Sequence, residues 1–374
     1  MTEADFALFQ MPCILRRKIK DEFLHHMITK TPKEEGYYFP AEFAKHDGTW
    51  LSWPHKEASW PGKIDSIYPV YAEFIKLLAE GEPVNINVSN EAMKQKALLY
   101  LDKVSADMNR IEFFFHPTND AWCRDHGPAF LINPSAVDKK IILDWSYNAW
   151  GGKYPPFDLD DDIPTLVGKY LNIPVIYPGI VMEGGSVDFN GKGTLLTTTS
   201  CLLNPNRNPH LNQSQIETYL RDFYGVDNIL WLGEGIVGDD TDGHIDDITR
   251  FVNETTVVTV VEENRRDENY SVLKENVKSL SKFRLENGNA LNVVELPIPS
   301  AVVYDGMRLP ASYPNFYIAN KYVIVPTFRD KNDDRALQIL QSCFTDRKVI
   351  GLDSVDIIWG LGSFHCLSQQ EPSV

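Results

Sequence analysis

From residue 37 onward, short runs of β-branched and other apolar residues alternate with longer stretches in which apolar residues recur at helical spacing. Several of the short runs are apolar on both faces, which is typical of strands that are covered on both sides. The short runs predict strands at 84–88, 112–116, 140–144, 193–198, 256–261, 322–326 and 348–352. The longer stretches predict helices at 67–79, 91–101, 216–223 and 333–344. This order of elements indicates a mixed α/β fold.

The alternation continues along the chain without a proline- or serine-rich linker. We therefore expect one compact domain over 31–374, preceded by an N-terminal leader over 1–30. Ser214 and Glu217 have the spacing of a capping box and predict the start of the third helix. The glycines, prolines and acidic residues of 148–162 predict a loop on the surface.

Composition and charge narrow the classes of partner. The 374 residues are 43% hydrophobic and 24% charged, which suits a globular protein with a large core. Asp and Glu number 52 against 36 Lys and Arg, and the formal net charge of −16 repels phosphate backbones and anionic lipids while it attracts cations. We expect no nucleic-acid partner and no membrane partner, and the sequence leaves a homo-oligomer open.

Cysteine usage indicates a reducing compartment. The five cysteines are far apart and never form a CxxC pair, which argues against a disulfide framework and against a structural zinc site. No stretch approaches the roughly 18 uninterrupted apolar residues of a membrane span, and the first 20 residues lack the pattern of a signal peptide. We therefore predict a cytoplasmic location.

Glycines lie next to ionisable or nucleophilic side chains in the segments 119–128, 182–186, 243–247 and 360–366. In the last of these, Cys366 follows Gly360 and Gly362, and such a turn can expose a small nucleophile. The pKa of an unperturbed cysteine thiol is roughly 8.5, so an efficient thiolate needs a nearby cation or histidine. The alternative is a buried structural cysteine, although core strands seldom need two glycines so close together.

A histidine and a carboxylate are spaced to share a face in the third segment. If this segment is extended, the side chains of His244 and Asp246 emerge on the same side, so that a base and a carboxylate share a pocket. The same pattern could ligate a divalent metal, although the glutamate that closes a calcium loop is missing. A metal-dependent hydrolase built on His244, Asp246 and Asp247 therefore stays open as an alternative.

Two further carboxylates, Glu183 and Asp125, accompany glycines or Trp122 at predicted strand ends. One cysteine, one histidine and three carboxylates in a single pocket would leave strong repulsion between the carboxylates unless a cation filled the pocket. A planar guanidinium suits such a pocket, because its five donors form a fixed fork that matches carboxylates on two sides. The sequence thus predicts a site for a small cationic guanidine substrate.

Taken together, these residues resemble the agmatine deiminases, a branch of the guanidine-modifying enzymes that also includes bacterial-type peptidylarginine deiminases. The ordered series of motifs is more specific than any one of them. The similar segments are 31–37, 48–54, 122–125, 148–152, 183–186, 203–209, 243–247, 311–320 and 360–370. One departure is the Gly-Leu-Gly-Ser-Phe sequence at 360–364, where relatives usually carry more glycine.

The resemblance implies a pentein fold, a five-bladed α/β propeller in which five ββαβ-like units surround a central site with pseudo-fivefold arrangement. It implies that Cys366 is the nucleophile and His244 the general acid/base. It implies that Asp125 and Asp246 grip the guanidinium, and that Glu183 orients His244 and contacts a guanidinium nitrogen. The implied reaction converts agmatine to N-carbamoylputrescine and ammonia through a covalent thiouronium intermediate, without a metal or an organic cofactor.

The distal ammonium of agmatine requires acidic residues at the far end of the pocket. Glu35, Asp239 and Asp240 are the candidates, and Trp122 is the candidate wall of the substrate site. His365 also matches a family position, and we interpret it as loop packing, because adjacent side chains in an extended segment point apart. The same chemistry on peptidylarginine or free arginine and a non-catalytic binding protein of this fold remain as alternatives.

Overall fold

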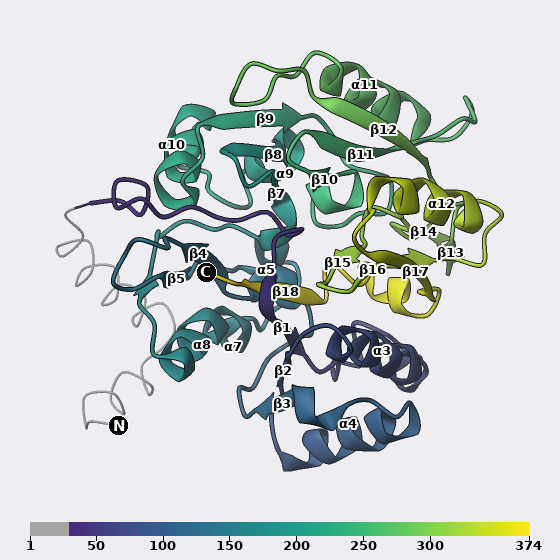
Figure 1. The fold of residues 1–374 in the computed structure, drawn as a ribbon. Coiled ribbons are helices and arrows are strands. Elements are labelled where there is room, and N and C mark those ends of the chain that lie inside the picture. The colour runs from purple at the N-terminus through teal and green to yellow at the C-terminus, as the bar shows by residue number, and fades with distance from the viewer. Residues whose placement is uncertain (1–29) are drawn as a thin grey trace.

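The fold repeats one structural unit, which a computed structural model describes for residues 30–374 (Figure 1). In each of five sheets, one strand pairs antiparallel with its neighbour and that neighbour pairs parallel with the next strand. A helix lies between the two parallel strands in the sequence, so every unit has the order ββαβ. Apart from Lys30, the predicted leader lies outside the described residues.

The strands group by unit as follows. The first sheet has the order β18 (Ser368–Pro372), β1 (His46–Ser52), β2 (Val84–Asn87) and β3 (Ile111–Phe114). The other four units are β4 (Ala129–Ile132), β5 (Lys140–Leu143) and β6 (Val175–Ile176); β7 (Val187–Phe189), β8 (Thr194–Thr198) and β9 (Asn228–Leu232); β10 (Thr249–Asn253), β11 (Thr256–Val261) and β12 (Asn292–Pro297); and β15 (Tyr317–Ile318), β16 (Tyr322–Thr327) and β17 (Lys348–Asp353). A separate hairpin consists of β13 (Val303–Tyr304) and β14 (Met307–Arg308).

The longer helices lie on the outside of the molecule and the strands within it (Figure 1). They are α3 (Ile64–Ala79), α4 (Glu91–Lys103), α8 (Ile163–Leu171), α10 (Gln213–Tyr224), α11 (Tyr270–Leu280) and α12 (Asp333–Cys343). Single turns are α5 (Cys123–His126), α6 (Ala149–Gly152), α7 (Asp158–Asp161), α9 (Thr199–Leu202) and the 3-10 turns η1 (Met108–Arg110), η2 (Gly184–Ser186), η3 (Ile245–Asp247) and η4 (Ile357–Gly360). None of the helices in the described part of the chain has both the length and the hydrophobicity needed to cross a bilayer.

The mixed α/β prediction is confirmed, and so are all the predicted strands and helices, with ends that shift by up to three residues. The predicted capping box is wrong. Asn212 caps α10, because its side chain accepts from the backbone of Gln215 while the Gln215 side chain accepts from the backbone of Asn212. Eleven of the 18 strands in the described residues were not predicted from the pattern, and neither were helices α8 and α11.

The prediction of a surface loop at 148–162 is confirmed only for its middle, because residues 152–156 are exposed. Trp150, Asp160 and Asp161 are buried at its two ends. The two buried carboxylates accept backbone N–H groups: Asp160 accepts from Asn119, and Asp161 accepts from Tyr147. Acidic residues that cap backbone donors cannot be told from a solvated acidic run by composition alone.

In all five units, the residues with reactive side chains occupy the same position relative to the strands. The residues that directly precede the first strand of a unit lie at the middle of the molecule: α5 precedes β4, η2 precedes β7, η3 precedes β10, and residues 315 and 366 come two positions before β15 and β18. Buried apolar clusters, such as the one formed by Leu51, Ile86 and Phe74, lie between the sheets and the outer helices. Packing of the units therefore fixes the five loops against one another.

Candidate active site

Cys366 lies in the loop before β18, buried to 93% and facing a cavity. Its Sγ accepts a hydrogen bond of 2.9 Å from Nδ2 of Asn315 and lies 3.7 Å from Oδ2 of Asp246. Gly362 is required beside it, because a Cβ there would lie 3.2 Å from Sγ and 2.6 Å from the Trp122 ring. Burial and the negative charges of Asp246 and its neighbour Asp247 raise the pKa of the thiol well above its usual value. Cys366 is therefore a thiol until a cation enters the pocket.

The nucleophile loop carries a leucine where the backbone conformation favours glycine. Leu361 has a φ of 71°, in the left-handed region where a side chain costs roughly 1–2 kcal/mol. Its side chain lines the cavity next to Gly360 and Gly362. The loop keeps its sharp turn despite the leucine.

His244 lies between three carboxylates and is 1% exposed. Its Nδ1 is 3.8 Å from Oδ1 of Asp125 and 3.9 Å from Oδ1 of Asp246, while Nε2 is 3.9 Å from Oε2 of Glu183. Burial alone would lower the pKa of His244, but the charge of Asp125 and the side chains of Cys201 and Glu183 outweigh burial and raise it well above the usual value. The ring is therefore poised to donate a proton.

The two predicted guanidinium ligands, Asp125 and Asp246, lie 3.8 and 3.9 Å from Nδ1 of His244, and Asp125 lines the cavity whereas Asp246 does not. Gly185 N donates to Oδ1 of Asp125 at 2.9 Å, and Trp150 Nε1 donates to Oδ2 at 2.9 Å. Oδ1 of Asp246 is buried without a hydrogen-bond partner, which leaves it available to a donor. Gly185 has to be glycine, because a Cβ there would lie 2.5 Å from Nδ1 of His244.

Glu183 lies behind His244 and is held by a buried arginine. Nε of Arg207 donates to Oε1 of Glu183 at 2.6 Å, and both side chains are fully buried. Burial would raise the pKa of Glu183, but Arg207 and His244 lower it below its usual value. The other oxygen of Glu183 remains on the side of His244, a geometry suited to orienting the imidazole. Glu183 does not line the open cavity, so its contact with a guanidinium nitrogen stays a prediction.

A cavity of ≈ 180 Å³ leads from Cys366 towards the surface. Trp122, Trp150 and Tyr154 form aromatic walls, and Trp122 stacks on Trp60 at 5.1 Å between ring centroids. Asp240 lines the cavity, and its carboxylate accepts from the hydroxyl of Tyr154. Aromatic walls with acidic groups at both ends suit a flexible chain that carries two positive charges.

The three acidic residues predicted to bind the distal ammonium lie in different places in the structure. Asp240 lines the cavity as predicted. Asp239 does not line it, because its carboxylate accepts from the backbone of Thr241 and His244 at 2.8 and 3.0 Å and so closes the turn that carries His244. Glu35 is exposed in a turn whose backbone oxygen binds Asn133, outside the cavity. A short acidic motif near the start of the chain carries no signal about which side of the fold it faces.

Two residues of this site were missed in the sequence. Trp150 reaches Asp125 because Ala149 and Trp150 have φ angles of 50° and 55°, which turn the indole inward. Asn315 reaches the thiol from the unit that begins with β15. The glycine pair after Trp150 was the available signal for a strained turn, whereas nothing in the sequence distinguishes Asn315 from other loop asparagines.

The donor atoms also test the metal alternative. Within residues 30–374, Glu183, Cys201 and His244 form one group of possible ligands, and Asp246, Asp247 and Cys366 form another. The three residues proposed as one metal set are therefore divided between two groups. Asp247 is further unsuited as an anionic ligand, because burial and the charge of Asp246 raise its pKa well above the usual value.

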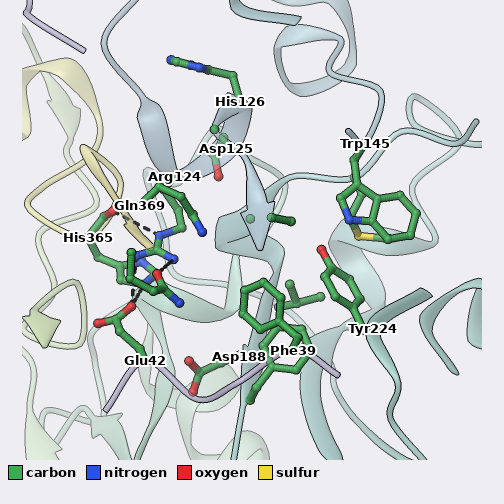
Figure 2. A pocket seen from close by; sticks show the side chains of 17 residues that line it. Phe39, Glu42, Arg124, Asp125, His126, Trp145, Asp188, Tyr224, His365 and Gln369 are labelled. Carbon is green, nitrogen blue, oxygen red and sulfur yellow. Dashed lines mark hydrogen bonds and ion pairs between the residues drawn. The ribbon is translucent and has the colours of Figure 1, made fainter. Parts of the chain in front are cut away.

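A second cavity, of ≈ 30 Å³, lies on the other side of Asp125 (Figure 2). Figure 2 shows Glu42, Arg124 and His365 gathered on one side of this cavity, opposite Phe39, Trp145 and Tyr224. Glu42, Arg124 and His365 form an ionic cluster that supports the active site, because His365 contacts Asp246.

Comparisons with known proteins agree with this geometry. The model of the Porphyromonas-type peptidyl-arginine deiminase family matches residues 38–372. The chain belongs to this family. It is 36% identical over 373 residues to the agmatine deiminase of Stutzerimonas stutzeri, which covers 92% of the chain and 98% of the relative.

Two solved structures have the same fold as this family member. The agmatine deiminase of Enterococcus faecalis has a TM-score of 0.86 and 32% identity, covering 92% of the chain and 98% of the relative. A cysteine-to-serine variant of the C. jejuni agmatine deiminase, with substrate bound, has a TM-score of 0.82 and 33% identity, covering 90% and 96%.

Proposed function

We propose that this family member is an agmatine deiminase, which hydrolyses agmatine to N-carbamoylputrescine and ammonia. The observation that carries the proposal is the Cys366 thiol at an aromatic cavity that Asp125 also lines, with Oδ2 of Asp246 3.7 Å from the sulfur. Carboxylates on two sides hold a planar guanidinium and leave its central carbon open to sulfur. The named agmatine deiminases among its relatives support the same substrate.

The first half of the reaction uses the substrate's own charge. Guanidinium binding offsets the carboxylates that raise the pKa of Cys366, so the thiol loses its proton to water. The thiolate forms a C–S bond with the central carbon and gives a tetrahedral adduct. His244 then protonates one nitrogen, and the C–N bond breaks. Ammonia departs, and an S-alkyl thiouronium remains on Cys366.

The second half reverses the role of His244. The imidazole, now neutral, accepts a proton from water as the water oxygen attacks the thiouronium carbon. The C–S bond breaks, the Cys366 sulfur takes the hydroxyl proton of the adduct and becomes a thiol again, and a ureido product is released. Glu183 keeps its charge beside Arg207 and holds the imidazole during both proton transfers. Neither half requires a metal or an organic cofactor.

The charge of the cavity lining favours agmatine over arginine. Asp120, Asp125 and Asp240 line the cavity, and the only cationic side chain among the described lining residues is Lys56, 3.4 Å from Asp120. An arginine substrate would bring a carboxylate into this acidic cavity without an arginine to bind it. Peptidylarginine and free arginine remain the alternative substrates of the same chemistry.

A direct assay tests the proposal. The purified protein should release ammonia and N-carbamoylputrescine from agmatine, with kcat/KM at least tenfold above that for arginine or a blocked arginine peptide. A Cys366→Ser variant should release none, while a chelator should leave the rate unchanged. Ammonia release from the serine variant at the wild-type rate would contradict the covalent mechanism. A higher kcat/KM for the arginine peptide than for agmatine would show that the substrate is peptidylarginine.

We also propose that the five ββαβ units close into a five-bladed propeller around this site. The support is that each unit contributes the residues before its first strand to the same centre. A crystal structure in which the five sheets did not surround one axis would contradict this arrangement.

A further inference from the structure

His365, the neighbour of the nucleophile, lies between two carboxylates and is 2% exposed. Its Nδ1 is 2.6 Å from Oδ2 of Asp246, and its Nε2 is 2.8 Å from Oε2 of Glu42. His365 therefore connects two acidic residues through its two ring nitrogens, rather than only packing the loop as predicted from the sequence.

Glu42 fixes the far side of this bridge. Oε1 accepts from the backbone N–H of Ile318 at 2.8 Å and lies 3.0 Å from Nη2 of Arg250. Oε2 accepts from Nη2 of Arg124 at 3.0 Å in addition to His365 (Figure 2). Burial would raise the pKa of Glu42, but Arg250, His365 and Arg124 lower it well below the usual value. Glu42 is thus an ionised anchor that lines the small rear cavity and not the substrate cavity.

The bridge uses only one oxygen of Asp246. Oδ2 lies 2.6 Å from Nδ1 of His365, accepts from Nδ2 of Asn315 at 3.4 Å and is 3.7 Å from Sγ of Cys366. Oδ1 has no hydrogen-bond partner and lies 3.9 Å from Nδ1 of His244. The contact with His365 is the shortest of those to Oδ2, so it contributes most to restricting rotation of the carboxylate and the direction of Oδ1. His365 lies in the turn before β18 and lines the small rear cavity, whereas Cys366 lines the substrate cavity, so His365 can contact Asp246 without entering the substrate cavity.

We propose that His365 is a positioning residue, which with Glu42 behind it locks Asp246 so that Oδ1 is presented to the guanidinium. This inference rests on the proposed function insofar as it needs a cationic ligand at Asp246. It assigns a role to Glu42 and His365, which do not line the substrate cavity and are not the nucleophile. Replacing buried ion pairs by apolar groups often leaves stability unchanged, so a purely structural role is a distinct alternative that experiment can separate.

Two isosteric variants test the two arms of the bridge separately. In His365→Asn, the amide nitrogen lies near the position of Nδ1 and can still donate to Asp246, whereas the contact with Glu42 is lost. In His365→Gln, the longer side chain places its amide near the position of Nε2 and can still contact Glu42, whereas the contact with Asp246 is lost. We expect kcat/KM to fall about 10- to 150-fold in His365→Gln, the value of a hydrogen bond to a charged group, and clearly less in His365→Asn.

The pH profile gives a readout that loss of packing would not move. The hydrogen bond from His365 lowers the pKa of Asp246, so loss of this bond should raise that pKa and move the acidic limb of kcat/KM to higher pH in His365→Gln and less in His365→Asn. The other groups that face Asp246 are unchanged in both variants; they are Asp125, Asp239, His244, Asp247, Arg250, Asn315 and Cys366.

A second readout does not depend on the identity of the substrate. The ratio of the rates at which 2-chloroacetamidine, a cation, and iodoacetamide, which is neutral, alkylate Cys366 measures the grip of Asp246 on an amidinium. This ratio should fall about tenfold or more in His365→Gln and stay within about threefold of wild type in His365→Asn.

His46→Gln is the matched control. His46 is equally buried and contacts Glu82 at 3.1 Å and the backbone oxygen of Glu42, remote from the substrate cavity. It should lower the melting temperature without moving the acidic limb or the alkylation ratio. Equal losses in His365→Asn and His365→Gln, with both readouts unmoved, would overturn the positioning role. An inactive wild-type protein that still shows the alkylation difference would instead overturn the proposed substrate alone.

Discussion

The indole of Trp150 donates to Oδ2 of Asp125 at 2.9 Å, from a turn in which the four successive residues 149–152 have positive φ angles. Trp150 therefore supports a guanidinium ligand and forms a wall of the same cavity. The hydrogen bond joins the turn before β4 to a loop between β5 and β6 of the same unit, 25 residues further along the chain. It also leads to the first prediction.

Replacing Trp150 by Phe should lower kcat/KM for agmatine about 10- to 150-fold, because Asp125 loses a hydrogen bond to its charged form while the cavity wall is kept. Steady-state kinetics of ammonia release measures this. Trp53→Phe is the control, since Trp53 is 1% exposed and its Nε1 has no hydrogen-bond partner. A fall in Trp150→Phe no larger than in Trp53→Phe would remove Trp150 from the site.

The raised pKa of Cys366 predicts how the free protein reacts with a neutral alkylator. Because burial and nearby carboxylates disfavour the thiolate, the rate of modification by iodoacetamide should be low at neutral pH and should keep rising as the pH increases. Mass spectrometry at a series of pH values, with Cys366→Ser as the reference for other sites, measures the rate at this thiol. A rate that has already levelled off at neutral pH would show that the empty pocket contains a thiolate.

Arg207→Met should destabilise the protein by about 3–5 kcal/mol at neutral pH, because it leaves the Glu183 carboxylate buried and unpaired. The exposed pair of Arg221 and Glu217 provides the control, and Arg221→Met should cost within about 0.5 kcal/mol. Urea unfolding of the two variants and the wild type measures both values. Similar losses for the buried and exposed pairs would contradict the prediction.

The same pair predicts a pH dependence of stability. Since the folded-state pKa of Glu183 is lowered, its carboxylate contributes stability above its ordinary pKa, and this contribution is lost as the pH falls through the lower folded-state value. The free energy of unfolding should therefore decrease more steeply on acidification in the wild type than in Arg207→Met. Parallel pH dependences in urea titrations would mean that Arg207 does not keep Glu183 ionised.

Kinetics with two substrates should distinguish the role of Asp240 from that of Asp239. Asp240→Asn should raise KM for agmatine about tenfold and leave KM for butylguanidine, which lacks the distal ammonium, nearly unchanged. Asp239→Asn should impair both substrates alike, because Asp239 closes the turn before His244. Equal effects of Asp240→Asn on the two guanidines would show that the distal ammonium binds elsewhere.

Much of the fold and the chemistry of the site followed from local features of the chain. Strands such as 256–261 were predictable because β-branched runs favour extended backbone wherever they are placed. Cys366 and His244 stood out because glycines next to reactive side chains are a local signal. Glu35 failed as a site residue for the opposite reason, since an acidic motif does not encode the side of the fold on which it lies.

The sequence by itself determined the alternation of elements, the acidic balance and the residue types that a guanidinium site needs, since each of these is a property of neighbouring residues. Only the tertiary structure decided which side chains meet. Glu42 and His365 are 323 positions apart, and Trp150, Asn315 and Arg207 reach the site from separate loops. Hydrogen bonds and ion pairs depend on distances of a few ångströms between side chains, and those distances exist only after the five units have packed against one another.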